Sequence, residues 1–295
     1  MLTIIVWGLR ILKTAVISAA AFLVASTCGA ETNRADKSDY TLFNPTPREL
    51  MREMFTDRPD LTESPYTVDA GHFQIEMDVL NYSYDRHNYD HSAVEATSLA
   101  PMNLKVGLCN RTDLQVMIEP WTSVRTRDRA ANSTEKNRGF GDITPRLKFN
   151  VWGNDEGPTA LGLMPFVKIP SNQDGLGNNS VEGGLIIPFA AALPAGWGFG
   201  TMLEVDVMKD GDNNGYHPEF TSSITFSHDI AGRLGGYVEF FNVASAENDA
   251  RWLASVDFGF TYGLTDDIQL DAGVNIGVTR ATDDVNPFLG ISVRF

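Results

Sequence analysis

The C-terminal part of the chain, from Arg251 to Phe295, alternates between apolar and polar residues with almost no interruption. One series is Trp252, Ala254, Val256, Phe258, Phe260, Tyr262 and Leu264, and the residues between them are small or polar. After a short turn the same alternation runs from Ile268 to Val278. Successive side chains of a β-strand point to opposite faces, so each stretch is predicted to be a strand with one apolar and one polar face.

Such strands fit two architectures. In a soluble β-sandwich the apolar face packs on a second sheet and the polar face meets water. In a transmembrane β-barrel the arrangement is inverted, with the apolar face toward lipid and the polar face toward the lumen. The rest of the chain must decide between them.

Period-two segments begin near Gly71 and number twelve. The segment at 181–193 is apolar on both parities and carries the weakest signal. The twelve segments cover residues 73–79, 102–108, 114–119, 142–151, 161–169, 181–193, 197–207, 220–228, 234–241, 252–264, 268–278 and 289–295.

The connections between these segments alternate in length. Short turns, such as 109–113 and 265–267, alternate with longer polar connections at 85–91, 125–138, 171–180, 209–217 and 245–249. Short turns on one side and long loops on the other are typical of outer-membrane barrels. We therefore predict that residues 71–295 form an all-β, transmembrane, antiparallel up-and-down barrel of about twelve strands, with both ends on the periplasmic side.

The N-terminal residues 1–30 have the order of a secretory signal peptide. Arg10 and Lys13 precede an apolar run at 14–25, and small residues follow up to Ala30. The run is shorter than the roughly 20 apolar residues of a membrane-spanning helix. A minor alternative is a lipoprotein signal with lipid attached to Cys28, for which Thr27 is a poor fit.

The charge of the chain is strongly negative. Its 23 Lys and Arg stand against 38 Asp and Glu, a formal net charge of −15. Cleavage after Ala30 removes two cations and no acid, so 21 against 38 leaves −17. This excess argues against a nucleic-acid partner. The mature chain keeps one cysteine, Cys109, and so forms no internal disulfide.

Residues 31–70 are expected to be a periplasmic N-terminal segment with one short helix. Thr46, Pro47 and Glu49 match a capping box, and Leu50, Met51, Met54 and Phe55 follow at helical spacing. Two roles are open for this segment. The favoured one is a short helix that seals or packs on the bottom of the barrel, and the alternative is a plug that enters the lumen.

Two stretches of sequence resemble a known family. The run from Asp57 to Pro65 leads into Val68 to Glu76, and a later run from Gly139 to Ile143 precedes Arg146 to Phe149. These runs are similar to outer-membrane transporter proteins grouped under the MetA-pathway of phenol degradation, over about residues 45–295. The resemblance implies an outer-membrane barrel that transports aromatic or other small compounds, and it assigns no binding residue.

The C-terminus also resembles a known signal. Ile291, Val293 and the terminal Phe295 lie at every second position, as in the last strand of bacterial outer-membrane barrels. That resemblance implies recognition by the barrel assembly machinery and a location in the outer membrane of a Gram-negative-type cell.

The residues predicted to face the lumen carry both signs of charge. If cations on one arc face acids on the other, they set up a field that orients a polar or zwitterionic solute. The alternative is that the charges pair across the lumen and fill it, with a structural role only. The predicted lumen-lining charges are Glu76, Asp78, Lys105, Glu119, Asp142, Arg146, Lys148, Lys168, Glu204, Asp206, Glu239, Asp257 and Asp271.

Catalytic and metal sites receive little support. His87 and His91 share a loop with acidic residues, but the spacing is loose. The loop at 210–215 resembles a calcium loop but lacks the terminal bidentate Glu. His228 ends a strand containing Ser222, Ser223 and Ser227, yet no serine lies in a nucleophile motif. We predict no cofactor, no metal and no enzyme activity.

Three classes of function remain. A channel for small molecules, with aromatic or hydrophobic compounds as candidates, is favoured. A structural or adhesive barrel without transport is second, and a lipid-modifying outer-membrane enzyme is a distant third. The predicted partners are outer-membrane lipid, the assembly machinery and a small-molecule solute.

Overall fold

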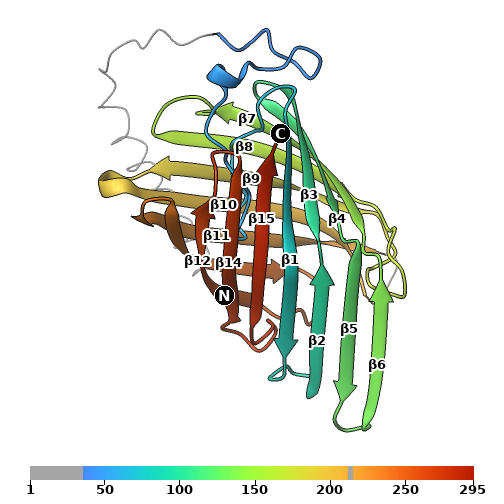
Figure 1. Cartoon of the computed structure of the whole chain (residues 1–295). Coiled ribbons are helices and arrows are strands. Elements are labelled where there is room, and N and C mark those ends of the chain that lie inside the picture. The colour runs from blue at the N-terminus through green and yellow to red at the C-terminus, as the bar shows by residue number, and fades with distance from the viewer. Residues whose placement is uncertain (1–35, 212–214) are drawn as a thin grey trace, which may run out of the picture. The chain divides into compact units, whose positions relative to one another are not determined.

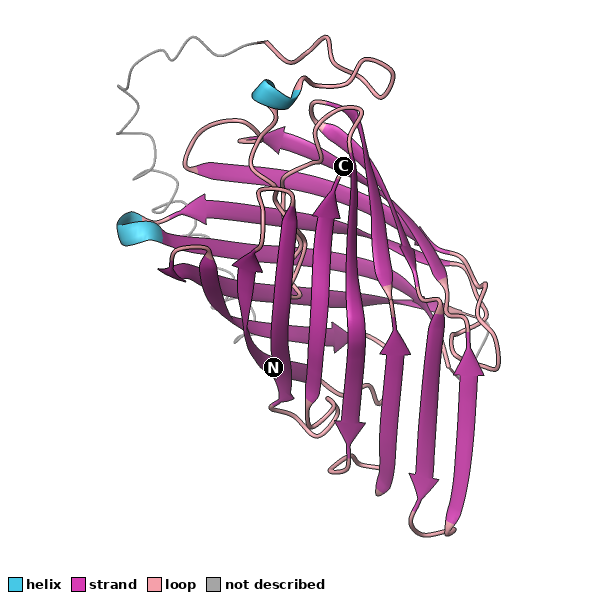
Figure 2. Cartoon of the chain, viewed as in Figure 1, coloured by secondary structure: helices cyan, strands magenta, loops and turns pink. Residues whose placement is uncertain are grey.

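The computed structural model describes residues 36–211 and 215–295. The predicted signal peptide, with Cys28, lies outside the described residues. Residues 37–295 form one compact unit. Nearly all of its regular structure is β-strand (Figure 2). No helix in the described ranges is long and apolar enough to cross a membrane.

Within the described residues, fifteen strands and two single-turn 3-10 helices follow one another. They are η1 (Arg48–Leu50), β1 (Phe73–Asp85), β2 (Ser92–Leu99), β3 (Met102–Cys109), β4 (Thr112–Ile118), β5 (Trp121–Asp128), β6 (Ser133–Gly139), β7 (Ile143–Trp152), β8 (Thr159–Lys168), β9 (Glu182–Ala192), η2 (Pro194–Gly196), β10 (Trp197–Lys209), β11 (Tyr216–Ala231), β12 (Leu234–Ser245), β13 (Leu253–Gly263), β14 (Ile268–Gly277) and β15 (Asn286–Arg294).

Twelve of these strands form a closed ring. The order β1–β3–β4–β7 continues through β8 to β15, and β15 pairs with β1, so the sheet has no free edge in this ring (Figure 1). Every pairing in the ring is antiparallel, and all of them except β1–β3, β4–β7 and the closing β15–β1 join strands that follow one another in the chain. The predicted twelve-stranded antiparallel barrel is confirmed.

The three remaining strands extend the sheet beyond the ring. β2, β5 and β6 pair in that order on the outer half of β1, and we call them the outer flap. They are separated from β3, β4 and β7 where Pro101, Pro120 and residues 140–142 interrupt the chain. Proline has no N–H to donate to a sheet, so the ladder breaks there.

The outer flap corrects one expectation. The predicted long loop at 125–138 is instead part of the hairpin formed by β5 and β6, with a turn at 129–132. Its side chains are polar on both faces, for example Arg125 and Thr126. Because neither face needs apolar cover, the period-two signal that revealed the other strands is absent here.

The burial of side chains is inverted relative to a soluble protein. On β13, Phe258 and Phe260 are 43% and 55% exposed, while Asp257, directly before Phe258, is fully buried. Asp271 on β14 is likewise only 3% exposed. Such a broad apolar outer surface is unfavourable in water, and in a closed barrel it faces lipid.

The interior has one apolar patch in an otherwise polar lumen. Met164 on β8, Ile186 on β9 and Met202 on β10 are buried against one another, with Phe166 and Phe241 packed beside them. This patch explains the sequence at 181–193, because apolar residues on β9 face lipid on one side and the patch on the other. The patch is thus the reason that this strand lacked alternation.

The predicted helix before the barrel is wrong in extent. Only η1 forms, and its N-cap residue Pro47 makes no side-chain capping bond. The Thr46 hydroxyl is buried without a hydrogen-bond partner among the described residues. Instead, the backbone N–H of Arg52 donates to Asp69 Oδ2 at 3.0 Å, which holds the chain in an irregular course where the helix was expected. Contacts with distant residues override the local capping signal.

Candidate functional site

The chain between η1 and β1 makes contacts with inward-facing side chains around most of the ring. We call residues 52–70 the inner segment. At its C-terminal end, the N–H of Val68 donates to Asp113 Oδ2 at 2.9 Å, and Ala70 bridges to Gly107. A Cβ on Gly107 would lie 2.0 Å from the Asp69 carbonyl oxygen, so only glycine allows this close approach.

Asp57 is the most heavily engaged residue of the inner segment. Its carboxylate lies 2.6 Å from Lys148 Nζ on β7 and 2.5 Å from Lys105 Nζ on β3. Lys105 also pairs with Glu76 on β1. Burial by itself raises the pKa of Asp57, but the two ammonium groups outweigh burial and hold this pKa well below its usual range. Asp57 is therefore an anion fixed between two buried cations.

Arg58 makes the corresponding contact on the other side. Its guanidinium lies 2.5 Å from Asp78 on β1 and 2.7 Å from Asp271 on β14, and stands 5.5 Å from the centre of the Phe288 ring. A Cβ on Gly290 would lie 2.1 Å from Arg58 Nη2, so the glycine makes room for the guanidinium. Adjacent residues of opposite sign thus join the segment to β1, β3, β7 and β14.

Farther along, the segment crosses toward β12. The Leu61 N–H donates to Glu239 at 2.8 Å, and the Thr62 hydroxyl contacts both Glu239 and Ser223. Glu63 then pairs with Arg146 on β7 at 2.5 Å. Glu239 is held only by neutral donors, whereas Glu63 faces a cation. The charge environment therefore differs between the two sides of the lumen.

Seven of the thirteen predicted lumen charges contact the inner segment. They are Glu76, Asp78, Lys105, Arg146, Lys148, Glu239 and Asp271. We call six of them, all except Glu239, the paired arc, because each has a partner of opposite charge on or beside the inner segment. The cations pair with Asp57 and Glu63 rather than across the open lumen, an arrangement that neither sequence hypothesis included.

Three predicted lumen charges lie near the outer rim. Asp142 precedes β7 and accepts hydrogen bonds from the backbone of Ser171 and Asn172. Lys168 ends β8 and pairs with Glu182. Glu119 lies in the break between β4 and β5, next to Gly141. These residues border the entrance rather than the middle of the lumen.

The three remaining charges form an acidic arc together with Glu239. We use this name for Glu204 and Asp206 on β10, Glu239 on β12 and Asp257 on β13. Ser255 donates to Asp257 Oδ2 at 3.0 Å, but Asp257 Oδ1 and Asp206 Oδ1 are buried with no hydrogen-bond partner among the described residues. In the parts of the chain that the structure describes, no lysine or arginine lies in an ion pair with these four carboxylates.

Besides a cavity of about 630 Å³ against residues 52–54, two cavities lie against residues 55–66 of the inner segment. A cavity of about 350 Å³ is lined by Glu204, Glu119, the apolar Ile186 and Met202, and Phe241. A second cavity of about 280 Å³ lies against Phe199 and the stacked rings of Phe55 and Tyr66, whose centres are 3.9 Å apart. Asp60 and Glu63 line both cavities. The inner segment is therefore the partition between them.

Asp60 faces both cavities from the inner segment. Burial raises its pKa to about 7, a hydrogen bond from Thr225 opposes this shift, and the nearby carboxylates of Asp57 and Glu63 add to it. The carboxyl group consequently changes charge near neutral pH at the narrow point between the two cavities.

The residues of the predicted assembly signal lie at the closing seam of the barrel. Ile291 pairs with Met77, and Val293 pairs with Ile75, between β15 and β1. Phe295 exchanges backbone hydrogen bonds with Phe73, and its side chain is 63% exposed. The terminal side chain therefore faces outward at the end of the last strand.

The histidine and serines considered for catalysis do not converge. His228 lies at the turn side, where its ring nitrogens contact the carbonyl oxygens of Asp229 and Ala195 and its ring packs on Trp197. Ser223 lies inside the ring and contacts Thr62. His228 therefore packs at a turn, and Ser223 packs against the inner segment.

Comparison with solved structures supports the fold. The COG4313 outer membrane channel from Pseudomonas putida F1 superimposes with a TM-score of 0.56 at 12% identity, over 82% of this chain and 100% of that one. The NanC porin (TM-score 0.47, 9% identity, 75% of this chain and 98% of that one) and the CymD monoaromatic hydrocarbon channel (0.42, 9%, 76% and 87%) are less similar.

Sequence comparisons give the family. No curated protein matches the chain. A family model described as "Putative MetA-pathway of phenol degradation" matches residues 56–295, which include most of the inner segment and the whole barrel. The chain belongs to this family of phenol-degradation MetA-pathway proteins.

Proposed function

We propose that the protein is an outer-membrane channel for small molecules with an apolar body, such as aromatic compounds. The closed ring, its apolar outer surface and its likeness to a solved outer-membrane channel support the membrane location. The phenol-degradation family supports an aromatic solute. Export by the predicted signal peptide and insertion through the C-terminal strand complete this proposal.

The 350 Å³ cavity is the observation that carries the solute class. Its wall includes Ile186, Met202 and Phe241, an apolar surface inside a lumen whose other buried side chains are mostly polar. Apolar side chains offer no hydrogen bonds to water, whereas an aromatic ring that packs on them removes apolar surface from water. Glu204 and Asp60 line the same cavity, so a polar substituent of the solute can form hydrogen bonds there with these carboxyl groups or with water.

We propose that the inner segment acts as a partial plug. It separates the two cavities and is held by ion pairs on one side of the ring, while on the other side only neutral groups reach Glu239. A solute therefore has to pass between the inner segment and the acidic arc. A narrow path of this kind favours small solutes over the larger ones that an open porin admits.

The alternative of an outer-membrane enzyme has no supporting geometry in the groups just described. The ring nitrogens of His228 contact backbone carbonyl oxygens, and the hydroxyl of Ser223 contacts Thr62 of the inner segment. We therefore propose a channel without catalytic activity, and a structural barrel without transport becomes one outcome of the test.

The test is block of ion current by phenol in planar bilayers containing the purified protein. We expect phenol to reduce the wild-type current in a saturable manner, and glycerol at the same concentration to leave it unchanged. Met202→Thr removes apolar wall and should weaken phenol block by at least about threefold. Asn275→Ser changes a polar residue of the same cavity and should leave the block intact.

Two results would contradict the proposal. Absence of current from correctly folded protein favours a structural barrel. A current that phenol and glycerol affect equally, or phenol block unchanged in Met202→Thr, removes the apolar wall as the solute site.

A further inference from the structure

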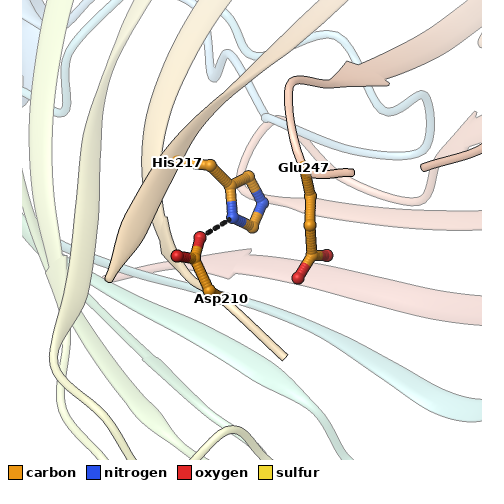
Figure 3. A group of neighbouring side chains, drawn as sticks. All are labelled: Asp210, His217 and Glu247. Carbon is orange, nitrogen blue, oxygen red and sulfur yellow. Dashed lines mark hydrogen bonds and ion pairs between the residues drawn. The ribbon is translucent and has the colours of Figure 1, made fainter. Parts of the chain in front are cut away.

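A histidine lies between two carboxylates at the outer end of the acidic arc. Asp210 directly follows β10, His217 is near the start of β11, and Glu247 lies in the connection between β12 and β13. His217 Nδ1 is 2.8 Å from Asp210 Oδ1, and the second ring nitrogen is directed to the side where Glu247 stands (Figure 3). One ligand atom from each residue lies within 4.8 Å of the other two.

The three side chains are positioned rather than free in solvent. The side chains of His217 and Asp210 are only 11% and 15% exposed. Glu247 Oε1 accepts a hydrogen bond from the Gly211 N–H at 2.6 Å, which holds it beside the chain that carries Asp210. His217 has the same parity as Glu219 on β11, so a further carboxylate lies on the same inward face.

We propose that Asp210, His217 and Glu247 bind a divalent transition-metal ion of the zinc class. One imidazole nitrogen and two carboxylate oxygens are ligands that zinc accepts, and three protein ligands leave a position for water. A bound ion would neutralise the two carboxylates. Ligand distances of about 2.0–2.2 Å require the three atoms to draw closer than they are now.

The ring binds the metal as neutral imidazole. Nδ1 gives up the proton that it shares with Asp210 when Nδ1 and the carboxylate oxygen become ligands, and Nε2 carries the ring proton instead. The oxidation state of the ion does not change. Because the ligands come from two separate outer connections, the metal would join the β10–β11 hairpin to the β12–β13 connection above the acidic arc.

The chain contains its own comparison site. His87 Nδ1 lies 2.8 Å from Asp284 Oδ2, the same donor pair at the same distance. The His87 side chain is 73% exposed, and within residues 36–211 and 215–295 no third ligand joins it in a cluster of metal-binding size. A histidine–carboxylate pair is therefore present in both places, and only His217 has the third ligand and the burial.

The experiment is titration of zinc chloride into the full-length, metal-free protein in detergent, followed by calorimetry. We expect one ion per chain in wild type and in His87→Ala. His217→Ala and Glu247→Gln should each lose at least about tenfold in affinity. Calcium, which prefers all-oxygen sites, should not displace zinc. Unchanged single-channel conductance without zinc shows that each variant is folded.

The proposal fails if the wild type shows no saturable zinc binding. It also fails if His217→Ala binds zinc with the same affinity as the wild type. If calcium then also competes equally with zinc, the carboxylates alone are responsible for the binding. Conductance and phenol block are measured without zinc. A failure of the zinc site therefore does not count against the proposed channel function, which the inference does not require.

Discussion

Both sides of the lumen carry buried carboxylates, but only the paired arc holds them in ion pairs with cations. On the paired arc, Lys105 and Lys148 share Asp57, and Arg58 joins Asp78 to Asp271. On the acidic arc, Asp206 and Asp257 each keep a buried oxygen without a partner among the described residues. The difference lies in the cations, because Lys105, Arg146 and Lys148 of the barrel and Arg58 of the inner segment all form their ion pairs on the paired arc.

This asymmetry assigns different roles to the two arcs. Buried ion pairs are costly to desolvate and add little net stability, but removing one partner is strongly destabilising. We infer that the paired arc fixes the position of the inner segment. Unpaired carboxylates in a narrow lumen attract cations, so the acidic arc should line the path. Substitutions on each arc separate these roles.

The largest effect is expected from Asp57→Asn. It leaves the fully buried Lys148 without its ion-pair partner, and should lower the free energy of unfolding by about 3–5 kcal/mol. Urea unfolding of the reconstituted barrel measures this. The double variant Asp57→Asn with Lys148→Met should recover part of the loss, and a double variant no more stable than Asp57→Asn would show that this pair is not the anchor.

A second comparison sets the outer face of the acidic arc against its inner face. Phe258→Arg places a charge in lipid and should cost about 2–4 kcal/mol, whereas Asp257→Asn removes a carboxylate that has no cationic partner and should cost far less. Folding yield into lipid vesicles is the measurement. Equal losses in the two variants would contradict the inside–outside orientation.

Ion selectivity tests the acidic arc directly. Glu204→Gln combined with Asp206→Asn should lower the potassium-to-chloride permeability ratio by at least about twofold, because both carboxyl groups of β10 leave the path. The ratio comes from the reversal potential in a salt gradient. Glu76→Gln, on the paired arc, is the matched control and should leave the ratio nearly unchanged; an equal effect of both changes would remove the distinction between the arcs.

The smallest predicted effect is a pH dependence from Asp60. Since its pKa is raised to about 7, the carboxyl is negative above this pH and neutral below it. Cation selectivity should therefore fall as pH is lowered through about 7 and be restored as pH rises. Asp60→Asn should remove this step and hold selectivity at the low-pH level. A step that persists in this variant must arise from another group.

Alternation predicted the barrel well because lipid and lumen impose opposite chemistry on successive residues, as Asp257 and Phe258 illustrate. It missed β5 and β6, whose two faces are both polar and impose no period. The course of the inner segment could not be found locally, since Asp57 meets its partners 48 and 91 residues away. For the same reason, Thr46 and Glu49 indicated a cap that contacts from Asp69 override.

The proposed metal ligands could not be recognised from their spacing in the sequence. The loop at 210–215 lacks a terminal glutamate of its own, but the fold brings Glu247 from a different connection to the side of His217. The pairing of β10 with β11 brings Asp210 to His217, and the pairing of β11 with β12 brings Glu247 to them.

The most direct test of the two-arc account is the single-channel current of the wild type beside a variant lacking residues 31–70, both checked for folding by heat-dependent gel mobility. The account predicts a small, cation-selective conductance for the wild type and a clearly larger one, still cation-selective, for the deletion variant. No current from either folded protein, or the same conductance from both, would contradict it.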